Sequence, residues 1–202
     1  YDRCNKMKCI MYHYIRDYDN QFPNFRYLSK NKFLKQLDFF EKNGVLASSM
    51  EKFKKDTFLL TFDDGLKDHI FAAECLKKRK KIGIFFIPTF PYKEKKILNV
   101  HKIHILLGKL GGQECLKNLK SFLYKNNILK LKKDSIFKNA YRAQINDKDT
   151  LEFKKILNYS LNLEQKNIFL NEMFMNYNIK QKYSDIYLSI EEIRYLVDLG
   201  MI

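Results

Sequence analysis

The chain has 202 residues and a formal net charge of +15, from 38 Lys and Arg against 23 Asp and Glu. Hydrophobic residues make up 46% of it, with only 7 Gly and 3 Pro, which excludes a collagen-like polymer and argues against a disordered chain. No apolar run approaches the roughly 20 residues that span a bilayer. No signal peptide is visible, so the compartment stays open, with the cytoplasm as the default expectation.

The positive charge has two interpretations. A basic protein attracts nucleic acids, anionic glycans or anionic membrane surfaces. The sequence is also rich in Lys, Asn, Ile, Tyr and Phe together, which is typical of translation from AT-rich DNA. The densest basic cluster, residues 77–81, lies at the predicted end of a helix, where cations interact well with the helix dipole. We therefore expect no nucleic-acid partner.

The first part of the chain alternates between strand and helix patterns. Phe33, Leu37 and Phe40 recur at helical spacing, and Gly44 is well placed to end that helix. Two near-continuous apolar runs, TFLLTF and IGIFFI, are typical of parallel strands covered on both faces. The expected strands are 8–14, 57–62 and 82–87, and the expected helices are 30–43 and 66–80.

From Ile97 to about Asp185 the pattern is helical and rich in lysine, which predicts a large helical insertion. Residues 149–152 (DTLE) have the arrangement of a helix capping box. Residues 189–192 (SIEE) have it as well, ahead of a helix that Gly200 ends in a left-handed conformation. Residues 201–202 then look like the beginning of a strand.

The most distinctive local pattern is a pair of adjacent carboxylates, Asp63 and Asp64, between a buried strand and Gly65. In parallel α/β proteins the carboxyl ends of the strands face the functional crevice. Two like charges this close are costly without a cation or a shared proton. A divalent metal resolves the conflict if one carboxylate ligates it while the other acts as a base. The simpler alternative is that Asp64 caps the following helix.

The string TFDDG at residues 61–65 resembles the first motif of the polysaccharide deacetylases, the NodB-type domain of carbohydrate esterase family four. Four further segments look like that family, in the same order: MYHY at 11–14, KDH at 67–69, IFFIPT at 84–89 and LSIEEI at 188–193. The resemblance implies an α/β fold, a partial and distorted β/α barrel with a large helical insertion. Its expected parts are the N-terminal half of the barrel at 1–96, the insertion at 97–185 and the resumed barrel, cut short, at 186–202.

The resemblance also implies an activity: metal-dependent hydrolysis of N- or O-acetyl groups on a polysaccharide or oligosaccharide. It makes Asp63 the catalytic base and Asp64 a ligand of the metal, with zinc the first expectation and cobalt or nickel also suited to the site. The other two ligands, the histidines of an H-S/T-x-x-H motif, are expected beyond Ile202, together with the general acid. We therefore expect residues 1–202 to be an inactive piece of a larger deacetylase. Leu66 departs from the family pattern, because many members have proline there.

The histidines present offer no clear substitute for that motif. His101 and His104 share a helix face, but their spacing is three residues and the hydroxyl residue is absent. His13, at the end of the first strand, would point toward the same rim as Asp63 and could line the pocket or orient a carboxylate. The simpler expectation is a buried histidine with its hydrogen bonds satisfied. His69, one turn into the following helix, is expected to be structural.

Other functions fit the sequence less well. The four cysteines, at positions 4, 9, 75 and 115, form no C-x-x-C metal pair. A Walker-type ATPase needs G-x-x-x-x-G-K-S/T, and no glycine in the sequence begins that motif. A haloacid-dehalogenase-like phosphatase needs D-x-D, whereas Asp63 and Asp64 are adjacent. The alternative that stays open is a non-catalytic, basic module on the same fold that binds a glycan or a nucleic acid.

Overall fold

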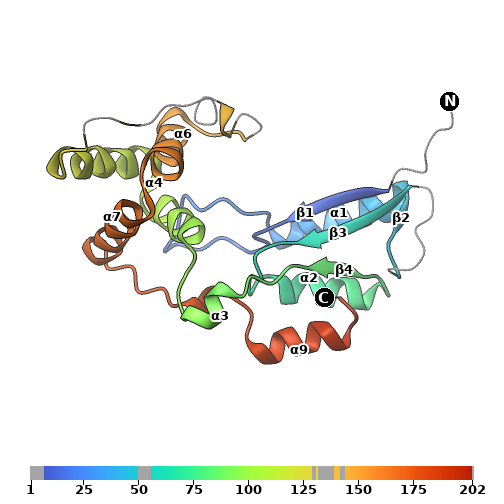
Figure 1. Cartoon of the computed structure of the whole chain (residues 1–202). Helices are drawn as coiled ribbons and strands as arrows, with labels where there is room; N and C mark the ends of the chain where they lie inside the picture. Colours follow the sequence, from blue (N-terminus) through green and yellow to red (C-terminus); the bar gives the residue numbers. More distant parts are fainter. Residues whose placement is uncertain (1–6, 50–55, 129–130, 132–138, 142–143, 202) are drawn as a thin grey trace. The chain divides into compact units, whose positions relative to one another are not determined.

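The computed structural model describes residues 7–49, 56–128, 131, 139–141 and 144–201. The chain divides into two compact units (Figure 1). The first unit is built from Tyr1–Tyr18, Tyr27–Lys96 and Gln181–Ile202. The second unit is built from Asp19–Arg26 and Ile97–Lys180.

A parallel sheet forms the centre of the first unit, so the chain is a mixed α/β protein, as predicted. The strands are β1 (Lys8–Tyr12), β2 (Val45–Leu46), β3 (Thr57–Phe62) and β4 (Gly83–Phe85). β3 is the central strand (Figure 1): β1 follows one of its edges from Phe58 to Phe62. Its other edge pairs first with β2 and then, from Leu60, with β4. The carboxyl ends of β1, β3 and β4 therefore meet at one end of the sheet.

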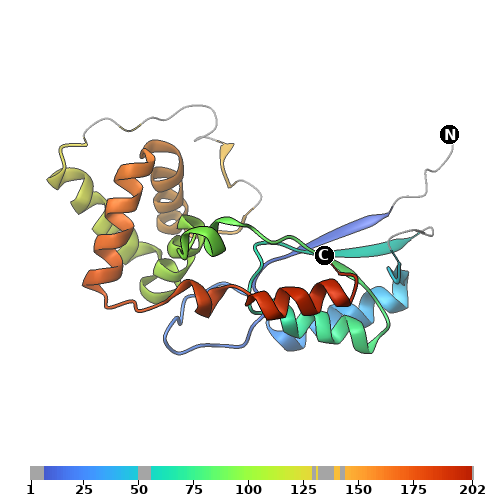
Figure 2. The same ribbon diagram turned by 60° about the horizontal axis from the view of Figure 1, so that its bottom comes forward.

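Helices cover one face of this sheet (Figure 2). They are α1 (Lys30–Asn43), α2 (His69–Lys78) and α9 (Ile190–Asp198), and two short helices, α3 (Phe90–Glu94) and α8 (Tyr183–Ile186), belong to the same unit. Because side chains alternate along a strand, every second residue of β3 joins the helices in one core. That core includes Phe58, Leu60, Phe62, Phe33, Leu37, Leu76 and Leu196. On the opposite face, Met11 and Phe86 are more than half exposed.

The second unit is helical in its described part. It contains α4 (Asn99–Lys125), α6 (Lys148–Lys155), a single π-helical turn η1 (Ile156–Ser160) and α7 (Leu163–Asn176). These elements share a second apolar core, with Leu106, Leu119, Phe153, Leu157, Phe169 and Leu170. α4 is kinked at Gly111, where φ is 76°. None of the helices in the described residues is long and apolar enough to cross a membrane.

Several element boundaries differ from the prediction. The predicted helix 66–80 begins only at His69, because the backbone at 65–67 pairs elsewhere: Lys67 N–H donates to Ile186, and Gly65 accepts from Leu188. The predicted strands 8–14 and 82–87 are shorter, and end at Tyr12 and Phe85. The two-residue strand β2 was not predicted at all.

Two helices test the capping boxes predicted from the sequence. The Ser189 capping box is confirmed, and Gly200 has the expected left-handed conformation, with φ of 67°. The predicted box at Asp149 is wrong, because Asp147 caps α6 instead: its carboxylate accepts from the N–H of Thr150 at 2.8 Å.

At the end of the described residues, the backbone lies beside β4, where a further strand of the sheet would begin. The carbonyl of Met201 accepts a hydrogen bond from the N–H of Phe85 at 3.0 Å, so Met201 lies alongside β4. Ile202, the second residue of the predicted strand, lies outside the described residues.

Candidate functional site

The two adjacent carboxylates lie in a sharp turn directly after β3. The N–H of Asp63 continues the sheet by donating to the carbonyl of Tyr12 at 2.9 Å. Asp64 and Gly65 then both adopt left-handed backbone conformations, with φ of 78° and 59°. Asp is among the few residue types that tolerate this region, at a cost of order 1 kcal/mol. The backbone of this turn is therefore strained, and the turn places its side chains at the carboxyl end of the central strand.

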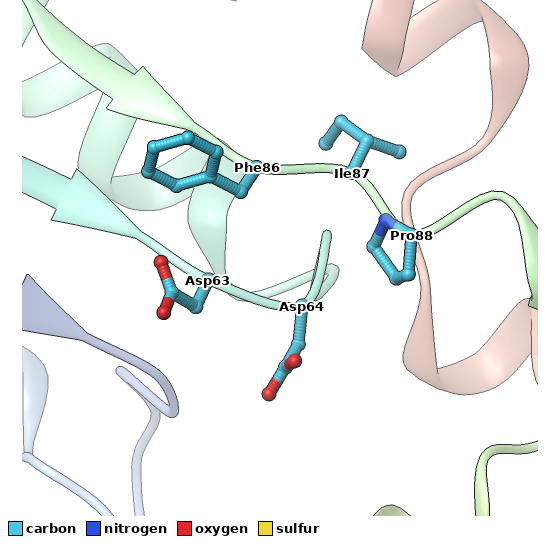
Figure 3. Close-up of a pocket in the computed structure, with 5 residues that line it drawn as sticks. All are labelled: Asp63, Asp64, Phe86, Ile87 and Pro88. Atoms are coloured by element: carbon cyan, nitrogen blue, oxygen red, sulfur yellow. The ribbon is translucent and has the colours of Figure 1, made fainter.

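These two carboxylates line one open pocket of about 520 Å³ (Figure 3). The other lining residues are Phe86, Ile87 and Pro88, which follow β4. Figure 3 shows the carboxylate of Asp63 directed sideways, and that of Asp64 directed away from the β4 segment. The pocket thus combines an apolar wall with two carboxylates, at the end of the sheet where the sequence predicted a functional crevice.

His13 follows β1 and contributes a third polar side chain at this end of the sheet. Its Nε2 atom lies 3.7 Å from Oδ2 of Asp64, and the two side chains are 40% and 28% exposed. The distance is too long for a hydrogen bond but suits an ion pair when the imidazole is protonated. His13 is not among the residues that line the pocket, so its predicted pocket-lining role stays a prediction.

His69 lies fully buried beneath this group. Burial lowers the pKa of His69 to about 4, so the ring is neutral at pH 7. Its Nε2 lies 2.9 Å from the carbonyl oxygen of His13, so the Nε2–H donates to that carbonyl. Its Nδ1 has no hydrogen-bond partner among the described residues.

An ion pair lies next to this hydrogen bond. Nε of Arg16 lies 2.7 Å from one oxygen of Asp68, and its Nη2 lies 2.9 Å from the other. Burial raises the pKa of Asp68, and the Arg16 guanidinium opposes that shift. The guanidinium also stacks over the ring of Tyr14, whose pKa burial raises.

The remaining candidate ligands lie elsewhere. His101 and His104 are neighbours on α4 in the second unit, and His101 is fully buried. Cys9, Cys75 and Cys115 are free thiols. Among the described residues, no group of three His, Cys, Asp or Glu side chains is placed to hold a metal ion. The donors at the candidate site are therefore Asp63, Asp64 and the neighbouring His13.

Sequence reasoning named both carboxylates and His13, but it missed the contribution of Asp68 and His69. The pattern KDH at 67–69 entered only as part of a resemblance, and His69 was expected to be structural. The contacts that tie these residues to His13 and Arg16 join segments more than fifty residues apart. No local spacing in the sequence signals such contacts.

Comparisons with known proteins give limited likenesses. No protein-family model matches the chain, and no curated protein matches it significantly. The structure of BC0361, a polysaccharide deacetylase from Bacillus cereus, is 24% identical over 40% of this chain, with a TM-score of 0.34. IcaB from Ammonifex degensii is 28% identical over 40% of the chain, with a TM-score of 0.31. The putative polysaccharide deacetylase BA0330 from Bacillus anthracis is 16% identical over 83%, with a TM-score of 0.32.

The chain spans only part of each of these proteins, namely 29%, 37% and 47% of the three solved chains in the same order. With TM-scores this low, the three structures do not define the fold of the chain. The class that the chain's own elements define is a mixed α/β protein with a parallel sheet and a carboxylate pair at its carboxyl end.

Proposed function

We propose that the chain is part of a deacetylase that hydrolyses N- or O-acetyl groups on a polysaccharide or oligosaccharide. The observation that carries this proposal is the left-handed turn that presents Asp63 and Asp64 in one open pocket at the carboxyl end of β3. The resemblance of TFDDG and its four companion segments to the deacetylases supports it. In this proposal residues 1–96 and 186–202 belong to a deacetylase barrel, and residues 97–185 are an insertion in it.

Asp63 is the proposed catalytic base. Asp63 lines the pocket and directly follows the central strand, so its backbone position is set by the sheet and not by a long loop. A carboxylate held there can accept a proton from a water molecule as that water attacks an acetyl carbonyl. The apolar wall of Phe86, Ile87 and Pro88 gives a substrate a nonpolar surface to lie against beside the two aspartates.

A metal fits these residues only in part. A catalytic zinc takes three protein ligands, and the described residues do not bring three suitable side chains together. We propose Asp64 as the ligand that this part of the protein contributes, with zinc as the expected ion. The two histidines that the resemblance implies beyond Ile202 stay a prediction, which the downstream reading frame tests directly.

The proposal is tested by acetate release from N-acetylated and O-acetylated oligosaccharides. We expect the chain with its native continuation to release acetate, and Asp63→Asn to lower that rate by roughly 100-fold or more, as removal of a general base does. Asp198→Asn is the matched control, because it removes an exposed carboxylate at the end of α9 in the same unit.

Two results would contradict the proposal. Acetate release that survives Asp63→Asn would show that this carboxylate is not the base. Tight binding of the oligosaccharides with no acetate released from any of them would favour a non-catalytic glycan-binding module. The expectation that residues 1–202 are inactive alone fails if the isolated chain releases acetate in an Asp63-dependent manner.

A further inference from the structure

We propose that Asp68 and His69, at the start of α2, act together as a positioning clamp that holds the loop after β1 and keeps His13 beside Asp64. The catalytic meaning of this clamp rests on the function proposed above, but its existence does not. Neither residue lines the pocket, so both act through the backbone and side chains of residues 13–16.

The first half of the clamp is the buried ring of His69. It has no exposed surface, and it packs edge-on against Phe62 and Phe85, with centroid distances of 5.6 Å and 5.9 Å. These two rings belong to β3 and β4, so the sheet itself fixes the orientation of the imidazole. The Nε2–H is thereby directed at the carbonyl of His13, 2.9 Å away. A buried donor held this rigidly defines where the His13 backbone lies.

The second half of the clamp is Asp68, which binds the loop at Ile15 and Arg16, two and three residues after His13. Its two carboxylate oxygens accept hydrogen bonds from Nε and Nη2 of Arg16, at 2.7 Å and 2.9 Å. This bidentate pairing fixes the direction of the contact as well as its distance. The backbone N–H of Ile15 also donates to Asp68. The side chains of Arg16 and Asp68 are 29% and 12% exposed, so the pair is shielded from most of the solvent.

The loop anchors matter for His13 because its side chain is 40% exposed. Within the part of the chain that the structure describes, its ring lies beside Asp64. Without the clamp, the loop keeps the hydrogen bond from Asp63 to Tyr12 and the pairing of Ile15 with Leu28. These contacts hold the residues on either side of His13 and leave its own carbonyl to His69. The positions of both partners therefore come from one short stretch: residues 63–65 set Asp64, and residues 68–69 set His13.

Two substitutions at one position separate positioning from packing. His69→Phe keeps a ring of similar size between Phe62 and Phe85 but removes the donor. His69→Gln keeps an N–H at about the reach of Nε2. We follow each variant of the chain by NMR, using amide hydrogen exchange at Ile15 and Arg16 and the nuclear Overhauser contacts between the His13 ring and the Asp64 side chain.

We expect His69→Phe to speed exchange at Ile15 and Arg16 by roughly two- to tenfold, the range that follows from the loss of one hydrogen bond. The contacts between His13 and Asp64 are lost in this variant, and exchange within β3 changes less than twofold. His69→Gln restores the contacts and the slow exchange. The clamp is refuted if His69→Phe keeps the His13–Asp64 contacts, or if His69→Gln fails to restore them.

A second variant covers the case in which His69→Phe does not fold. Asp68→Asn keeps the size of the side chain and weakens the grip on Arg16, and we expect the same loss of contacts between His13 and Asp64. Retention of those contacts in Asp68→Asn refutes the role of that residue. None of these measurements uses acetate release, so an inactive protein with an intact clamp would overturn the proposed function alone.

Discussion

His69 makes the stability of the first unit sensitive to acid. Burial lowers the pKa of His69 from 6.5 to about 4 in the folded protein, so the unfolded chain binds more protons between those two values. Stability is therefore full above about pH 6.5 and is lost as the pH falls toward 4. Between pH 7 and pH 4.5 this single group lowers the free energy of unfolding by about 2 kcal/mol, at 1.36 kcal/mol per pKa unit.

The assay is urea-induced unfolding at pH 7 and at pH 4.5, followed through NMR signals of β3 so that it reports the first unit. His69→Gln is the comparison, because it keeps an N–H donor and cannot be protonated. Carboxylates that titrate in the same range affect both proteins, so they cancel in the difference. We expect the wild-type protein to lose about 2 kcal/mol more than the variant on acidification. Equal losses in the two proteins would show that His69 is not buried as a neutral ring.

Two further predictions concern the packing of the second unit and a helix cap in the first. Gly112→Ala should lower the stability of the second unit by about 1–3 kcal/mol, because the added methyl would lie 2.6 Å from the backbone nitrogen of Thr150. Gly111→Ala, its neighbour, has room for the methyl, but its φ of 76° and ψ of 171° are almost restricted to glycine, so we expect a conformational cost of about 1–3 kcal/mol. Thermal unfolding measures both losses, and a neutral Gly112→Ala would contradict the steric argument. Ser189→Ala removes the hydroxyl that accepts from the N–H of Glu192, and should cost about 1 kcal/mol in urea unfolding, whereas Ser189→Asp should cost less.

The sequence predicted well those elements whose causes are local. The run TFLLTF became β3 with the predicted bounds, because a near-continuous apolar run of this length is typical of a central parallel strand. The helices cover one face of the described sheet, whereas the apolar run predicted cover on both. The helix at 30–43 also has the predicted bounds, since Ser29 caps its first turn and its apolar stripe faces the core. The carboxylate pair was placed correctly at the end of β3 for the same reason: its position follows from the strand before it.

The parts that the sequence did not predict depend on contacts between distant segments. The left-handed conformation of Asp64 is one example, because few residues other than glycine adopt such a φ and the sequence pattern does not indicate it. The ring of His69 is another, since its role follows from the carbonyl of His13, just after β1, and from two phenylalanine rings on β3 and β4. Loop residues 19–26 belong to the second unit, although in the chain they lie between β1 and α1 of the first, and no composition change marks that.

The interrupted order of the first unit has a consequence for how the protein folds. Its core contains Phe62 and Phe85 together with Leu188, Leu196 and Met201. Leu66 pairs with Tyr187, and most residues of the second unit lie between these two in the sequence. A ribosome therefore makes almost all of the second unit before it makes the residues that complete the first core. Contacts of such long range form slowly, and until they form the early strands expose apolar surface. The contacts among helices α4, α6 and α7 are closer in sequence. We therefore expect these helices to pack together before α9 is synthesised and completes the core of the first unit.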